Sequence, residues 1–209
     1  MIHYVDNFLP QDQFQALKNR ITRRFVATDK KKFNKNSDEP VRLTYHDPTG
    51  NWLEGCNLLG KECIPAIEKI ISTLQSLGIK ELHNYSVWYQ YIIDTMSIPV
   101  HQDQALRNSN QENTYTAILY MSDWESHYGG EFVVGDPIAP KDSEGRLVRV
   151  NELVEKQIIE PLPNRMLIWS RDVWHKVNTV TVNDPNYMRA FLGTGWSTTN
   201  DTNIYRNAH

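Results

Sequence analysis

A succession of short strand-like runs in the back half of the chain limits its fold more than any other feature. The runs are rich in β-branched and aromatic residues and are separated by turn residues, which is typical of antiparallel β-structure. They are YSVWYQYII, TYTAILYMS, EFVVG, RMLIWS, HKVNTVTV and MRAFLGTGW, and all follow Gly78. Strands of this kind predict a β-sandwich or jelly roll.

Two stretches before Gly78 predict helices instead. Phe14, Leu17 and Ile21 recur at helical spacing, and Pro10 suits the first turn of a helix. A second helix is expected from about residue 60 to residue 77, where apolar residues recur every three or four positions and a glycine follows. The expected fold class is therefore mainly β with supporting α-helices, the N-terminal helices packing on one sheet.

The chain length favours one domain. With 209 residues and 40% hydrophobic residues it can bury one substantial core, so a single domain over 1–209 is expected. Residues 1–80 would form a helical support region and 81–200 the jelly-roll core. The polar stretch from about Lys30 to Gly50 predicts an exposed loop and a candidate lid. A net charge of −3 does not suggest general affinity for nucleic acid.

Location and redox state follow from what the sequence lacks. It contains no apolar run of about 18 residues, so no contact with a membrane is expected. Its first residues lack the basic start and the apolar stretch of a signal peptide, so a cytoplasmic protein is expected. On a continuous helix Cys56 and Cys63 would lie about 10 Å apart on one face, too far for a disulfide. Reduced thiols are expected, unless a non-helical link joins the two cysteines.

The chemistry is indicated by His101-Gln102-Asp103, which follows the first strand-like run. In an extended segment, residues two apart point to the same side, so His101 and Asp103 can present an imidazole and a carboxylate to one ion. His175, between two later runs, offers a third ligand. Two histidines and one carboxylate bind one face of Fe(II) and leave open positions. The alternatives are an exposed loop for the tripeptide and a core histidine for His175.

Arg189, in YMRAFLGTGW, adds a fixed positive charge on the strand after the one that His175 opens. A guanidinium can bind a carboxylate through two parallel hydrogen bonds, as an anchor for the distal end of a dicarboxylate requires. The alternative is a surface arginine. Its apolar neighbours favour a side chain that points into a barrel.

The order of these elements resembles that of the prolyl 4-hydroxylase-like branch of the Fe(II)/2-oxoglutarate oxygenases. The matching elements are HQD, then SHYGGEF, then PLPNRMLIWSRDVWHKV, then Arg189, and the opening YVDNFLPQDQFQALKNRI is similar to the entry into the family's first helix. The resemblance covers nearly the whole chain and is more specific in the back half. It implies a double-stranded β-helix, a jelly roll whose open end holds the metal.

The resemblance also implies roles for particular residues. His101, Asp103 and His175 match the iron ligands, and Arg189 matches the partner of the distal carboxylate of 2-oxoglutarate. Tyr91 and Tyr120 resemble tyrosines that contact the same co-substrate, although each could instead be a core aromatic. The implied cofactors are Fe(II), 2-oxoglutarate as co-substrate and O2, with ascorbate as an optional reductant.

Two departures from the branch bear on the substrate. Prolyl hydroxylases of this branch more often have lysine where Arg189 stands, and a shorter gap from the second histidine. The stretch from about Asp136 to Glu160 is longer and more charged than a minimal member needs, so it either shapes a substrate surface or decorates a loop.

The expected activity is hydroxylation of a C–H bond with release of succinate and CO2, on a peptide or protein side chain such as proline by family analogy. Small-molecule and nucleic-acid substrates stay open, the latter because basic residues cluster near the N-terminus, although a solvated helix face explains them more simply. Arg171 is a candidate for contact with the substrate, or with solvent alone. Three tryptophans are candidates for substrate contact or for the core: Trp88, Trp124 and Trp174. Rival interpretations are a cupin-like metal enzyme and a non-catalytic binding module of the same fold.

Overall fold

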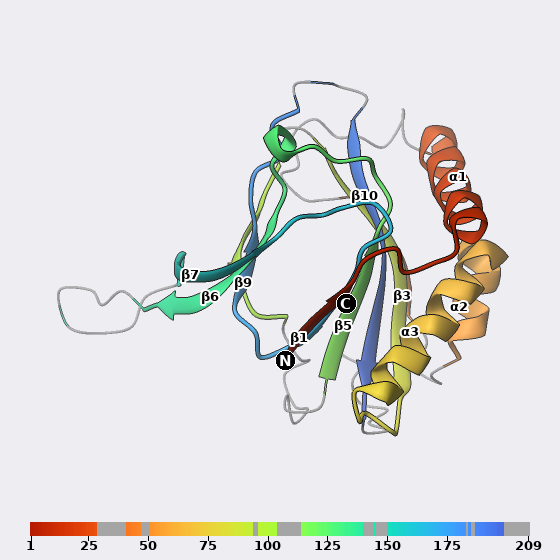
Figure 1. The fold of residues 1–209 in the computed structure, drawn as a ribbon, viewed down its shortest axis with the longest axis horizontal. Helices are drawn as coiled ribbons and strands as arrows, with labels where there is room; N and C mark the ends of the chain where they lie inside the picture. Colours follow the sequence, from red (N-terminus) through yellow and green to blue (C-terminus); the bar gives the residue numbers. More distant parts are fainter. Residues whose placement is uncertain are drawn as a thin grey trace.

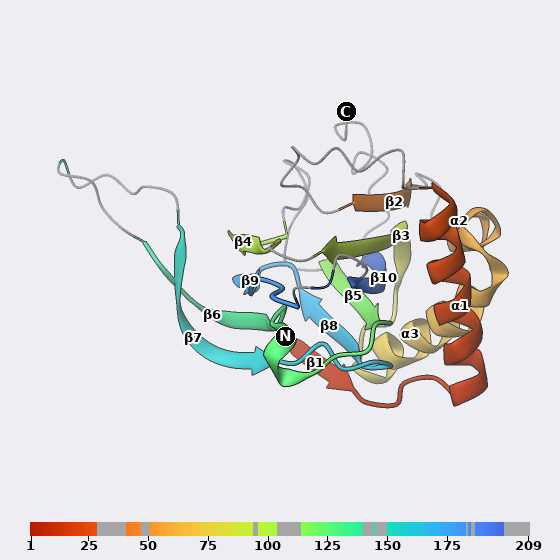
Figure 2. The ribbon, with the colours of Figure 1, turned by 90° about the horizontal axis from the view of Figure 1, so that it is seen from above.

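The computed structural model describes residues 1–28, 41–46, 51–93, 96–103, 114–139, 144, 150–182, 184 and 187–198, and every structural statement below concerns these. Two antiparallel β-sheets face each other, and helices cover the outer face of the larger sheet (Figure 1). The view from above shows the same layering, with the smaller sheet on the side away from the helices (Figure 2). The expected class, mainly β with N-terminal helices on one sheet, is confirmed.

The larger sheet has six strands and the smaller sheet four. In spatial order, the larger sheet contains β1 (Ile2–Val5), β8 (Met166–Ser170), β5 (Thr114–Tyr120), β10 (Met188–Ser197), β3 (His83–Ile93) and β2 (Val41–His46). The smaller sheet contains β4 (Ile98–His101), β9 (His175–Val177), β6 (Phe132–Ile138) and β7 (Glu152–Ile159). All the strand pairs are antiparallel, as alternating short strands predict.

The helices come before the central strands in sequence. They are α1 (Gln11–Thr28), α2 (Trp52–Leu59) and α3 (Ile64–Ser76), with short 3-10 turns η1 (Lys61–Cys63) and η3 (Ser126–Tyr128). Pro65 occupies the first turn of α3, and Gly78, with φ +90°, follows its end as predicted. None of the described helices is long and apolar enough to cross a membrane.

The larger sheet separates two apolar cores. The residues of β10 alternate between them, so Leu192 and Trp196 pack on the helix side while Phe191 packs between the two sheets. The β3 side chains alternate in the same way, with Trp88 between the sheets and Tyr89 on the helix side. A side chain on these strands therefore reaches the space between the sheets only from every second position.

Several sequence expectations need correction. Residues 41–46 fall in the stretch expected to be an exposed loop, yet they form β2 and pair with β3. β7 lies in the stretch left as either a substrate surface or a decorated loop, and it pairs with β6 across a bulge. The helix expected from residue 60 begins at Ile64, after η1. The possible lid role of the remaining residues between 30 and 50 lies outside the described residues.

The continuous helix on which the expected separation of the cysteines depended is not present. Gly60, with φ +133°, ends α2, so Cys56 and Cys63 do not share one continuous helix. Both thiols are buried and free, and the Cys63 thiol donates a hydrogen bond to the Gly60 carbonyl at 2.8 Å. The neighbouring Cys63 thiol, followed by burial, raises the pKa of Cys56 far above that of an ordinary thiol.

Asn164 joins the N-terminal segment to the turn before β8. Its side chain accepts a hydrogen bond from the Leu9 N–H at 2.9 Å and donates one to the Leu9 carbonyl at 2.8 Å. Its main chain accepts from the Phe8 N–H and donates to the Tyr120 carbonyl, both at 2.9 Å. Asn164 is buried at φ +61°, which asparagine tolerates better than most residues. This residue therefore fixes the path from β1 into α1.

Asn164→Ala should lower the free energy of unfolding by roughly 2–4 kcal/mol, because it leaves two buried backbone groups unpaired and strains the left-handed backbone. Asn164→Gly, which keeps the backbone conformation accessible, should lose less. Urea denaturation of both variants measures the difference. A loss under about 0.5 kcal/mol in the alanine variant would show that the Asn164 contacts do not stabilise the fold.

Candidate active site

Three side chains from the smaller sheet converge at one end of the space between the sheets. His101 is the last residue of β4, Asp103 follows two residues later, and His175 is the first residue of β9. His101 and His175 are register partners, with ring centroids 4.2 Å apart. One ligand atom from each of the three residues lies within 4.8 Å of the others. The structure therefore brings together the three residues that the sequence singled out.

Both imidazoles are oriented by backbone carbonyl groups. Nδ1 of His101 donates to the Pro99 carbonyl at 2.8 Å, and Nδ1 of His175 donates to the Val173 carbonyl at 2.9 Å. Nε2 of each ring is then left facing Asp103 Oδ1, at 3.6 Å and 3.7 Å respectively. Two imidazole nitrogens and one carboxylate oxygen fit the ligand set of a non-haem Fe(II) site.

The second oxygen of Asp103 is held by the larger sheet. Thr116 Oγ1 donates to Asp103 Oδ2 at 2.7 Å, and Trp169 Nε1 donates to the same oxygen at 2.9 Å. Thr116 and Trp169 are register partners on β5 and β8. These contacts leave Oδ1 available to a metal. Sequence reasoning missed both donors, although each lies on the inward-facing positions of a strand that it had predicted.

Electrostatics keep Asp103 ionised. Burial by itself would raise the pKa of this carboxyl group, but the neighbouring imidazoles of His101 and then His175 act against burial. The charge of Arg171 and the Thr116 hydroxyl act in the same direction, so the pKa lies well below the usual range for aspartate. Arg171, a candidate substrate contact, therefore acts on the carboxylate from the loop after β8.

His175 is almost fully enclosed. Its ring stacks on Phe132 at a centroid distance of 4.7 Å and meets the edge of Trp169 at 5.4 Å. Burial lowers the pKa of His175, although the Asp103 charge opposes that shift. The neutral imidazole, which is the metal-binding form, is favoured as a result.

A buried positive charge lies in the same inter-sheet space. Arg189 on β10 is only 2% exposed, and within the described structure its Nε and Nη1 have no hydrogen-bond partner. Its guanidinium carbon lies 5.0 Å from the centre of the Tyr120 ring, and the buried Tyr120 hydroxyl likewise has no partner there. Burial raises the pKa of Tyr120, although the Arg189 charge lowers it. Orphaned buried donors of this kind fit an anionic ligand.

Tyr91 does not reach this space. It is fully buried, but it packs in the core between the larger sheet and the helices, as Tyr89 does. The interpretation of Tyr91 as a co-substrate contact is therefore wrong, and its role as a core aromatic holds. Arg165, another buried arginine, differs from Arg189 because it forms two hydrogen bonds with Asp6, at 2.5 Å and 2.9 Å.

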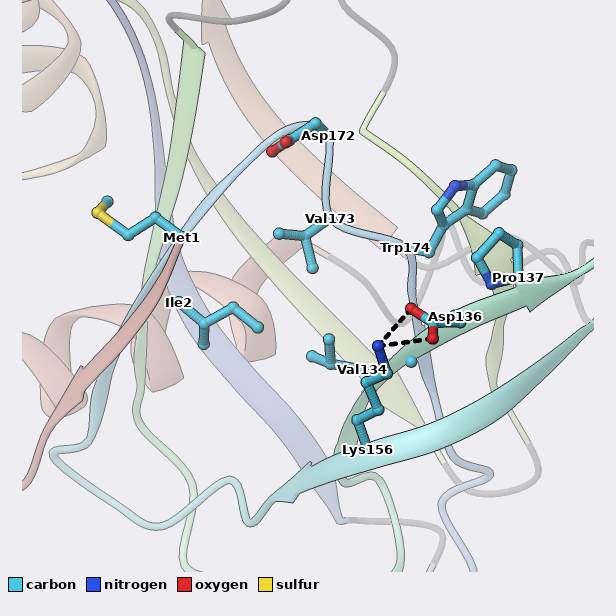
Figure 3. A pocket seen from close by; sticks show the side chains of 10 residues that line it. Met1, Ile2, Val134, Asp136, Pro137, Lys156, Asp172, Val173 and Trp174 are labelled. Atoms are coloured by element: carbon cyan, nitrogen blue, oxygen red, sulfur yellow. Dashed lines mark hydrogen bonds and ion pairs between the residues drawn. The ribbon is translucent and has the colours of Figure 1, made fainter.

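A pocket of about 330 Å³ adjoins the loop that leads into His175. It lies between the start of β1 and the end of β6, where Val173 and Trp174 from that loop meet Ile2 and Pro137 (Figure 3). Lys156 of β7 pairs with Asp136 of β6 at its wall (Figure 3). Of the three tryptophans considered for substrate contact, Trp174 lines this pocket. Trp88 is core, and Trp124 donates to the Gly129 carbonyl.

A family comparison covers the strands that carry the site. A model described as the 2OG-Fe(II) oxygenase superfamily matches residues 87–197, which is more than half of the chain. The match includes all three candidate metal ligands and Arg189. No curated protein matches the sequence significantly.

Solved structures share the fold along almost the whole chain. A prolyl-4-hydroxylase from Pseudomonas putida is 18% identical, with a TM-score of 0.57 over 94% of this chain and 91% of that one. A prolyl hydroxylase from Trichoplax adhaerens, solved with a hypoxia inducible factor peptide fragment, is 16% identical, with a TM-score of 0.59 over 94% and 83%. HygX from Streptomyces hygroscopicus, solved with nickel and 2-oxoglutarate, is 9% identical, with a TM-score of 0.61 over 95% and 83%. The double-stranded β-helix is thereby confirmed.

Removing either donor to Asp103 Oδ2 should weaken metal binding. We expect Thr116→Val and Trp169→Phe each to raise the Kd for Fe(II) by roughly 10- to 100-fold, because groups that orient a ligating carboxylate contribute on this scale. Anaerobic Fe(II) titration measures the change. Trp196→Phe is the matched control, since Trp196 Nε1 donates to Thr194 Oγ1 on the other side of the sheet. Unchanged affinity in both test variants would rule out this role.

Proposed function

Because the chain belongs to the 2OG-Fe(II) oxygenase superfamily, we propose that it hydroxylates a side chain of a peptide or protein, with proline as the first candidate. The enzyme uses Fe(II), 2-oxoglutarate and O2, and couples oxidation of a substrate C–H bond to release of succinate and CO2. In the proposal, the chain acts as a single oxygenase domain. One observation carries the site assignment: the three-ligand cluster and a buried arginine, two of whose nitrogens have no described partner, both contact side chains of the core between the two sheets.

His101, Asp103 and His175 would hold the metal. Carbonyl groups fix the two imidazoles, while Thr116 and Trp169 fix the carboxylate, so the ligands are oriented before the ion arrives. Phe132 and Trp169 exclude water from the face of His175. The bound ion supplies the redox chemistry, and these residues supply a rigid ligand set.

Arg189 would bind the distal carboxylate of 2-oxoglutarate, and the Tyr120 hydroxyl could donate a further hydrogen bond. A guanidinium stays charged when buried, and leaving it unpaired in an apolar core is costly. A carboxylate from the co-substrate would satisfy both groups. Superfamily membership also favours this interpretation over a cupin-like enzyme, which would need no such anchor.

The substrate class is supported by fold likeness and by the pocket beside His175. Two of the similar structures are prolyl hydroxylases, one with a peptide fragment. The pocket combines the apolar Val173, Trp174 and Pro137 with the ion pair of Asp136 and Lys156, and a pocket with apolar walls and a few polar groups is the kind of site that holds a ligand. The arginine anchor, where the branch more often has lysine, weakens the link to proline in particular.

A nucleic-acid substrate receives little support. Of the basic cluster near the N-terminus, Lys18 pairs with Asp123 at 2.8 Å and Arg20 lies 3.9 Å from Glu62. Both residues belong to α1, which lies on the helix-covered side of the larger sheet, away from β9, the strand that His175 begins (Figure 1). The other members, Arg23, Arg24 and four lysines from Lys30 to Lys35, have no described side chains.

The activity can be tested with a library of proline-containing peptides, incubated with Fe(II), 2-oxoglutarate and O2. We expect succinate formation that depends on peptide, together with gain of one oxygen atom on a proline, read by tandem mass spectrometry. Oxygen on a different side chain would support the proposal of a peptide hydroxylase but would replace proline as the residue that it modifies. Peptide-independent turnover with no oxygenated peptide would overturn the proposed substrate class.

His175→Ala should stay folded and lose stoichiometric Fe(II) binding, because one of three ligands is missing. Equilibrium dialysis under anaerobic conditions measures the metal content, and circular dichroism checks the fold. Full metal occupancy in this variant would refute the assignment of His175.

Arg189→Ala should raise the Kd for 2-oxoglutarate on the order of a hundredfold while leaving Fe(II) affinity nearly unchanged, since a buried charge-assisted contact is lost. The weak visible band of the metal-bound co-substrate provides the readout in an anaerobic titration. An unchanged Kd would move the anchor elsewhere, with Arg171 the next candidate.

A further inference from the structure

Gly130 lies directly against the side chain of Arg189. It is buried between η3 and β6, in the Ser126–Phe132 segment. A Cβ atom at this position would lie 3.1 Å from Arg189 Cδ, 3.5 Å from Arg189 Nε and 3.2 Å from Val180 Cγ2. Any residue other than glycine at this position would therefore press its Cβ atom against the Arg189 side chain.

The turn that contains Gly130 is tied to a neighbouring segment. The Gly130 N–H donates to the Thr179 carbonyl at 3.2 Å, and the Thr181 N–H donates to the Tyr128 carbonyl at 2.8 Å. One residue further on, the Asn178 N–H donates to the Glu131 carbonyl at 2.9 Å. Gly129 and Gly130 both have positive φ, +66° and +78°. The turn cannot retreat easily, so a larger residue at 130 would displace Arg189 instead.

The guanidinium end of Arg189 is bounded as well. The Tyr120 ring lies 5.0 Å from the guanidinium carbon. The strand that carries Arg189 is fixed next to it, since the Ala190 N–H donates to Ser122 Oγ at 2.6 Å and the Ala190 carbonyl accepts from Met121 at 2.9 Å. Arg189 therefore packs against an aromatic ring at its guanidinium end and against the Gly130 backbone along its side chain.

We propose that Gly130 is a positioning residue for the co-substrate anchor: it sets where the Arg189 guanidinium stands and so controls recognition of the distal carboxylate of the 2-oxo acid. This inference rests on the proposed role of Arg189. The inference gives a role to Gly130, the second glycine of SHYGGEF, which the roles of the metal ligands and of Arg189 leave unexplained.

The prediction concerns selectivity for the distal carboxylate. In Gly130→Ala the added methyl group must move Arg189 or Val180 by a few tenths of an ångström. A shift of that size should raise the Kd for 2-oxoglutarate on the order of tenfold. Binding of 2-oxovalerate, which has the same length and no distal carboxylate, should not change. Anaerobic calorimetry on Fe(II)-loaded wild type and variant measures both affinities.

Gly78→Ala is the matched control. Gly78 also has positive φ, +90°, but a Cβ there would meet no atom within 4 Å, so this variant reports the backbone strain alone. It should bind both 2-oxo acids as the wild type does. A second variant, Gly130→Ala with Val180→Ala, gives the added methyl group room on the side away from Arg189. It should recover most of the affinity for 2-oxoglutarate.

Three results would overturn the inference. They are an unchanged Kd for 2-oxoglutarate in folded Gly130→Ala, an equal loss of affinity for both 2-oxo acids, and failure of both the single and the double variant to fold. Wild-type protein that binds Fe(II) but not 2-oxoglutarate would instead refute the assigned role of Arg189 itself, so the two failures are distinguishable.

Discussion

Burial of both faces of the larger sheet is the constraint on which the site depends. On β10 every residue after Met188 is buried, so each side chain must suit either the helix-side core or the space between the sheets. Arg189 is the exception to an otherwise apolar or small set. A permanent charge placed there without a described acidic partner is expected to destabilise the free protein. Under the proposed function, the distal carboxylate of the co-substrate would neutralise this charge, so core stability would be lower where the anion binds.

The two sheets contribute different parts of the metal site. The smaller sheet provides the imidazoles, while the larger sheet holds the carboxylate through Thr116 and Trp169. Neither sheet alone forms an ordered site, so the ligand geometry depends on the packing between them. Phe132 and His175 contribute to that packing and to the site together, since their rings stack. Correct closure of the barrel is consequently a requirement for metal affinity.

Most of the architecture could be predicted from the sequence, because hydrophobic periodicity and turn residues are local signals. The candidates His101, Asp103, His175 and Arg189 could also be singled out, since spacing within a strand and apolar flanks are local. The predictions that failed depended on which strands pair with each other and in which register. Tyr91 was singled out by the family resemblance, and a matching position along the chain does not determine which face of a strand a residue occupies. β7 has mostly exposed side chains and a bulge, so its strand pattern is weak until β6 lies beside it.

Because α2 ends at Gly60, the two cysteines beside this break can report when the helical layer separates from the sheet. Cys56 and Cys63 are fully shielded in the helix-side core, and the Cys63 thiol donates a hydrogen bond to the Gly60 carbonyl at 2.8 Å. A thiol reagent added from solution can react with them only when the layer of α2 and η1 lifts from the sheet. The labelling rate therefore reads the opening free energy of the helical layer, separately from events in the barrel where the metal ligands lie. No label or probe has to be engineered into the chain for that purpose.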